Sequence, residues 1–132
     1  MSRVAAGNLS TRQAAQETGA RWQLVKQWVA DGVLRPSVVA HKQGGAHVWN
    51  DADVRQLRRM ETVRKQIASA MLPNGAFRVD WRELASVISR AGRTHLIVLG
   101  PRGVRLVARR ESIQQALRRT GQPALVLESA PQ

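Results

Sequence analysis

Residues 10–32, with the sequence STRQAAQETGARWQLVKQWVADG, decide the fold that we expect for the first half of the chain. Ser10 and Gln13 form the pattern of a capping box, in which each side chain bonds the backbone amide of the other residue. The first helix should start directly after Ser10 and end before Gly19, because glycine is favoured just past a helix C-terminus. A second helix is predicted over residues 21–30, stopped by the Asp-Gly pair that follows. Two helices joined by a short turn that contains glycine have the arrangement of a helix-turn-helix.

A hairpin and a third helix complete this first predicted domain. Residues 38–40 and 46–49 are short runs that favour β-strands, and Gly44-Gly45 between them is a pair favoured in tight hairpin turns. We therefore expect a hairpin, the wing of a winged helix-turn-helix. Asn50 should cap a helix over residues 51–70. The apolar residues of that helix recur every three or four positions, which predicts one buried face: Val54, Leu57, Met60, Val63, Ile67 and Met71.

The second half of the chain alternates between strand and helix patterns. Pro73-Asn74-Gly75 is the clearest break, so we predict one domain over residues 1–72 and a second over residues 76–128. The second domain has the order strand-helix-strand-strand-helix-strand, which is that of a ferredoxin-like sandwich. The fold class expected for the whole chain is α+β. The elements of the second domain are expected at residues 77–79, 81–91, 95–99, 104–108, 112–119 and 124–127.

The charge of the chain points to a polyanionic partner. Twenty-one lysines and arginines oppose nine acidic residues among 132, which gives a net charge of +12. Such a charge attracts nucleic acid and releases its counterions on binding. Most of the excess is arginine, which forms bidentate bonds to phosphate and to guanine. Six arginines of the second domain form no motif, and they could extend a DNA footprint or bind an acidic partner: Arg102, Arg105, Arg109, Arg110, Arg118 and Arg119.

Several other classes of protein are not expected. The chain has no cysteine, which excludes disulfides and thiolate zinc sites. Its three histidines are too widely spaced for a metal motif. No run of residues approaches a membrane span, and the N-terminus lacks the apolar stretch of a signal peptide. We expect a cytoplasmic, nucleoid-associated protein with no catalytic residue, no metal and no cofactor.

Five short motifs follow one another between residue 9 and about residue 60. They are Gly19-Ala20-Arg21, Val25-Lys26-Gln27-Trp28, Gly32-Val33-Leu34-Arg35-Pro36, Gly45-Ala46-His47-Val48-Trp49 and Asp53-Val54-Arg55-Gln56-Leu57. In their order and at about their spacing they resemble motifs of the MerR-type DNA-binding domain. That family has a glycine, a small apolar residue and a helix start at the first motif, then Leu-Arg-Tyr-Tyr, Gly-Leu-Leu-Arg-Pro, Gly-Tyr-Arg-x-Tyr and Asp-Leu-x-x-Leu. The chain resembles the excisionase-type domains of phages nearly as well.

The chain also departs from the family. Gln27 replaces a tyrosine that contacts phosphate, and His47 replaces an arginine of the wing. Pro73 stops the third helix where members of the family continue into an antiparallel coiled coil. The family's mode of dimerisation, and its activation of promoters by twisting DNA, therefore do not carry over to this chain.

The second helix of a helix-turn-helix enters the major groove, and this fixes the candidate residues. Arg21 and Gln23 are expected to read bases, and Lys26 to contact phosphate. Trp22 has two open interpretations, a core residue or an exposed residue that faces DNA. The resemblance implies that Trp28 and Trp49 are core residues, whereas Trp81 is expected in the core of the second domain. The full set of expected DNA-binding residues is Arg12, Arg21, Trp22, Gln23, Lys26, Gln27, Arg35, Lys42, His47, Arg55 and Arg58.

The sequence thus favours a regulator of transcription that binds specific double-stranded DNA as a homodimer. In this hypothesis the second domain dimerises or receives a signal or a protein partner. One alternative is an architectural factor of the excisionase or partition type, which bends or coats DNA. Another is an antitoxin-like protein, whose second domain neutralises a partner and whose first domain represses its own operon.

Overall fold

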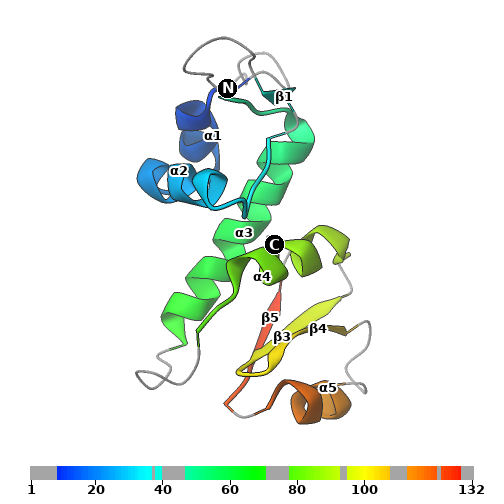
Figure 1. Cartoon of the computed structure of the whole chain (residues 1–132). Coiled ribbons are helices and arrows are strands. Elements are labelled where there is room, and N and C mark those ends of the chain that lie inside the picture. The colour runs from blue at the N-terminus through cyan, green and yellow to red at the C-terminus, as the bar shows by residue number, and fades with distance from the viewer. Residues whose placement is uncertain are drawn as a thin grey trace. The chain divides into compact units, whose positions relative to one another are not determined.

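The computed structural model of the chain describes residues 9–36, 38–39, 47–70, 78–92, 95–107, 113–121 and 123–128. In these ranges the protein has five helices, a two-stranded hairpin and a three-stranded antiparallel sheet, which is an α+β fold (Figure 1). The chain forms two compact units, Met1–Glu61 and Thr62–Gln132. The division falls inside α3 (Asp51–Ser69), whereas the predicted boundary at residues 73–75 lies outside the described residues.

Helix α1 (Thr11–Thr18) begins and ends as its sequence predicts. The backbone N–H of Gln13 donates to the Ser10 Oγ over 3.1 Å, and the backbone N–H of Ser10 donates to the Gln13 Oε1 over 2.9 Å. Both halves of the capping box are therefore present. Gly19 follows in the left-handed backbone conformation, with φ 77°. A residue with a Cβ adopts this conformation only with strain. This turn leads within three residues into α2 (Trp22–Ala30).

The first unit has its core between the helices and the hairpin. α1 contributes Ala14 and Ala15 to this core. Trp28 and Trp49 are 3% and 1% exposed, so the prediction that both are core residues is confirmed. The Trp49 Nε1 donates to the Thr11 Oγ1 over 2.9 Å, which satisfies the indole that burial removes from water.

The hairpin consists of β1 (Val38–Val39) and β2 (His47–Val48), paired antiparallel. The predicted glycine turn between these strands lies outside the described residues. Trp49 continues the pairing through an isolated bridge to Leu9. Asn50 and Asp53 then cap α3 reciprocally, with bonds of 2.9 and 3.0 Å. Four of the predicted apolar positions of α3 are buried, and Ile67 is half-buried; the four are Val54, Leu57, Met60 and Val63.

The second unit places one strand between two others. After the end of α3, the second unit contains α4 (Trp81–Arg90), β3 (Leu96–Gly100), β4 (Gly103–Val107), α5 (Ile113–Thr120) and β5 (Leu125–Glu128). The Asp80 side chain caps α4 by accepting the amides of Arg82 and Glu83. β3 pairs antiparallel with β4 on one edge and with β5 on the other. The predicted core residue Trp81 is half-buried.

The expected ferredoxin-like order is wrong for the described part of this sheet. In that order the strand predicted at residues 77–79 would lie in the middle of the sheet, between the last strand and the hairpin. Arg78 and Val79 instead belong to no strand, and Phe77 lies outside the described residues. The physical reason is that β5, the last strand, bonds directly to β3 of the hairpin, which leaves no place for another strand between them.

α5 covers one face of this sheet (Figure 1). Val98 and Val107 pack against Ala116 of α5 on that face. The helix end approaches the β3–β4 turn closely, because the Arg102 amide donates to the Thr120 carbonyl over 2.9 Å. A Cβ at Gly100 would collide with the Thr120 carbonyl oxygen, so this approach requires a glycine.

Candidate nucleic-acid interface

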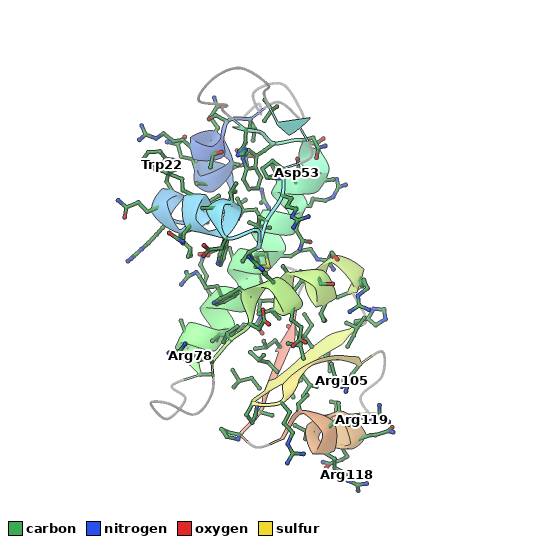
Figure 2. The ribbon with its side chains drawn as sticks, in the orientation of Figure 1. Trp22, Asp53, Arg78, Arg105, Arg118 and Arg119 are labelled. Atoms are coloured by element: carbon green, nitrogen blue, oxygen red, sulfur yellow. The ribbon has the colours of Figure 1, made fainter. Side chains whose placement is uncertain are left out.

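A cluster of one tryptophan and two cations lies on the surface of the α1–α2 pair. Trp22 is the first residue of α2 and is 37% exposed, so it is not a core residue; that it faces DNA stays a prediction. The Arg12 guanidinium carbon lies 4.2 Å from the centroid of the indole, and the Lys26 Nζ lies 4.3 Å from it. We call these three residues the Trp22 cluster; Figure 2 labels Trp22 beside α1 and α2.

Each member of the Trp22 cluster is positioned by the helix that carries it. Trp22 and Lys26 are four residues apart in α2, which puts them on one face of that helix. Arg12 belongs to the first turn of α1 and reaches the indole because α1 and α2 pack together. A cation over an indole gains about 0.5–1 kcal/mol at an exposed site. The cluster therefore holds two positive charges beside one apolar, exposed ring.

The start of α2 adds further groups that suit an anion or a base edge. The N-cap residue Arg21 has no side-chain hydrogen bond to the first turn of the helix, and α2 contains no acidic residue. Unpaired amides at a helix N-terminus, together with the helix dipole, favour a negative charge. Arg21 and Gln23 are both exposed there. These two predicted base-reading side chains thus flank Trp22 in the sequence and are accessible.

Gln27 is engaged within the protein. Its Nε2 donates to the Asp31 Oδ1 over 2.9 Å, one turn further along the chain. Both residues are exposed, so this bond competes with water. A contact from Gln27 to phosphate would use its remaining amide hydrogen, or would replace the bond to Asp31.

The wing contributes less than expected within the described residues. His47 is half-buried, and its Nδ1 is buried with no hydrogen-bond partner. That nitrogen faces the protein, so a phosphate contact from His47 would have to use Nε2. Lys42 lies outside the described residues. Arg35 is exposed next to the buried Leu34, which leaves its guanidinium accessible.

The predicted residues of α3 differ in their surroundings. Arg55 is exposed. Arg58 is half-buried, and its Nη2 donates to the Glu17 carbonyl near the end of α1 over 3.4 Å. This bond ties α3 to α1 and gives Arg58 a structural role. Burial lowers the pKa of the neighbouring Arg59, whose charge is therefore less favoured than that of an exposed arginine.

The structure brings together only part of the predicted set. Arg12, Trp22 and Lys26 are in direct contact, and Arg21 and Gln23 adjoin them along the chain. The contact between Arg12 and Trp22 was not predicted, because it joins two helices. The only signal for it in the sequence was the pair of a tryptophan and a lysine four residues apart, which marks that helix face.

Across the described ranges, no three residues among histidines, aspartates and glutamates are grouped so that they could hold a metal ion. None of the helices in those ranges is long and apolar enough to cross a membrane.

No family model matches the chain, and no curated protein is significantly similar to it.

Proposed function

We propose that the protein is a regulator of transcription that binds specific double-stranded DNA through α2. In this proposal the α1–α2 pair acts as the helix-turn-helix of a MerR-like or excisionase-like winged domain. The start of α2 enters the major groove, where Arg21 and Gln23 contact base edges. Lys26 and Arg12 contact the phosphates beside the groove.

The observation that carries the proposal is the exposed Trp22 cluster. The Arg12 guanidinium carbon and the Lys26 Nζ lie 4.2 and 4.3 Å from the centroid of this partly exposed ring, so one surface site combines an apolar ring with two cations. DNA offers the complementary chemistry, since phosphates attract the cations and thymine methyl groups contact apolar side chains. The net charge of +12 supports the same partner.

Two copies of the chain are part of the proposal. A single small module buries little surface on DNA, and paired half-sites give a dimer most of its specificity. The second unit is the proposed place of dimerisation. Half-sites recovered as an inverted repeat would agree with a two-fold dimer, whereas clustered direct repeats would favour the architectural alternative.

Selection from a random pool of duplex DNA tests the proposal. The full-length protein is used for the selection, and the affinities of the winning site and of a scrambled duplex are then measured. We expect a consensus, and a preference for the winning site of roughly 10³ or more, as specific readers show. Arg21→Ala should reduce this ratio by about 5- to 150-fold, since one good base contact contributes about 1–3 kcal/mol of discrimination.

Arg90→Ala is the matched control, because it removes one exposed arginine from α4 in the other unit. It should leave the ratio between the two duplexes unchanged. The proposal is overturned if no consensus emerges and both duplexes bind alike. It also fails if Arg21→Ala and Arg90→Ala change the ratio by the same factor.

A further inference from the structure

Three exposed arginines lie on α5 or on the strand beside it in the second unit. Arg118 and Arg119 belong to the last turn of α5, and Arg105 lies in the middle of β4. Figure 2 labels all three, around the helix and the strand beside it. We call these residues the α5 arginine surface.

The sheet register explains why Arg105 lies near α5. Arg105 is paired with Val98 of β3, and directly paired residues point to the same face of a sheet. Val98 packs against Ala116 of α5. Arg105 therefore belongs to the face that α5 covers, beside the helix that carries the other two arginines.

The three arginines have no counter-charge on α5. The helix contains no acidic residue, and its other exposed residues are Gln114 and Gln115. Among the acids of the unit that the structure describes, Asp80 caps α4 and Glu83 lies beside Gly103. Glu128 lies on β5, which β3 separates from β4.

Several other basic residues of the unit, though not the exposed Arg78 and Arg102, interact within the protein. Arg90 donates to the Ser86 carbonyl over 3.4 Å, and Arg82, Arg64 and Lys65 each have interactions within the protein. The side chains of Arg105, Arg118 and Arg119 make no hydrogen bond or ion pair with any residue in the described part of the chain. Favourable interaction with the helix dipole accounts for a cation in the last turn of α5. It does not account for Arg105, which is on a strand.

We propose that the α5 arginine surface binds the phosphate backbone of the DNA that the first unit recognises. The inference rests on the proposed function, and it adds a second contact region that carries no sequence information. Arginine and glutamine are both common donors to phosphate oxygens, and no acid on α5 opposes the approach of a polyanion. A base-reading role is not proposed, because nothing on this surface corresponds to a helix end or wing that would enter a groove.

The salt dependence of binding tests this surface. The full-length triple variant R105Q/R118Q/R119Q is compared with the wild type on the selected site and on a scrambled duplex. Each lost phosphate contact lowers the slope of log affinity against log salt concentration by about 0.9, so three contacts lower it by about 2.7. Both duplexes should lose affinity by the same factor, which leaves the preference for the selected site unchanged.

Two further variants make the result specific. R78Q/R82Q/R90Q also removes three positive charges, but from exposed arginines in and before α4. It should change the slope by less than 1. R105K/R118K/R119K keeps the charges and should retain most of the wild-type slope. Thermal unfolding of each variant verifies that it is folded.

The surface and the proposed function can fail separately. Suppose that Arg21→Ala reduces the preference for the selected site while R105Q/R118Q/R119Q leaves the salt slope unchanged. The proposed role of the α5 arginine surface is then wrong, and the proposed function stands. If no site is preferred but R105Q/R118Q/R119Q still lowers the salt slope, the proposed function is wrong, whereas the binding of DNA phosphates by the α5 arginine surface stands. Equal losses of slope in the two triple glutamine variants would overturn the surface, because they would reflect overall charge. Stoichiometric binding of an acidic protein that the α5 triple variant abolishes, with the DNA slope unchanged, would also overturn it.

Discussion

Replacing Trp22 by alanine is the most direct perturbation of the α1–α2 surface. A tryptophan buries about 150–250 Å² when it is enclosed, and Trp22 is 37% exposed, so its partial burial covers roughly 90–150 Å². At about 25 cal/mol per Å², the truncation should lower the free energy of unfolding by about 2–4 kcal/mol. The two cation contacts lie within this total and need a separate measurement.

A double-mutant cycle isolates the contact between Arg12 and Trp22. The free energy of unfolding is measured in urea for the wild type, Arg12→Ala, Trp22→Ala and the double variant, with helical circular dichroism as the signal. The ring lies 4.2 Å from the guanidinium carbon, at the surface, so we expect a coupling of about 0.5–1 kcal/mol. Screening by salt should reduce it only slightly at this distance.

The control cycle pairs Trp22 with Arg21, its neighbour in the sequence. Both arginines are exposed, but only Arg12 is in contact with the indole. The Arg21 cycle should therefore give a coupling near zero. A coupling for Arg12 that is zero, or equal to that for Arg21, would refute the view that the cluster is held by contact of its cations with the ring.

Three further substitutions test the packing and capping of the second unit by urea unfolding. Gly100→Ala should destabilise the protein by about 1–3 kcal/mol, because the new Cβ would collide with the Thr120 carbonyl. A change below about 0.5 kcal/mol would mean that α5 withdraws without cost. Asp80→Ala should cost about 1 kcal/mol through the loss of two bonds to the first turn of α4, whereas Asp80→Asn should retain most of the stability. Gln66→Ala should cost about 1 kcal/mol, since its amide bonds the main chain of Glu128 at both N–H and C=O on the outer edge of β5. No loss of stability on Gln66→Ala would show that water replaces these bonds fully.

The helix starts and stops could be predicted because they depend on neighbouring residues. Ser10 with Gln13, Asn50 with Asp53, and Asp80 all cap helices as their patterns predict. These bonds join residues two or three positions apart, so the sequence alone contains both partners. The apolar spacing of α3 predicted its buried face for the same reason.

The exposure of Trp22 was not a local property. Spacing alone allowed Trp22 to be a core residue with Val25, and only the packing of α1 against α2 leaves it at the surface beside Arg12. Arg58, one of the expected DNA-binding residues, is another case, because its bond to the Glu17 carbonyl spans 41 residues. Neither outcome follows from hydrophobic periodicity, which reports the face of a helix but not its neighbour.

The sequence by itself determined where the helices lie and are capped, where most of the strands lie, and that the chain is strongly basic. Tertiary structure alone decided the strand order β4-β3-β5 and the clustering of Arg105 with Arg118 and Arg119. Strand pairing joins residues as distant as Ile97 and Leu127, and several registers bury the same alternating side chains. The physical reason is that caps and periodicity act within one turn of chain, whereas sheet order depends on which distant edges can satisfy each other's hydrogen bonds.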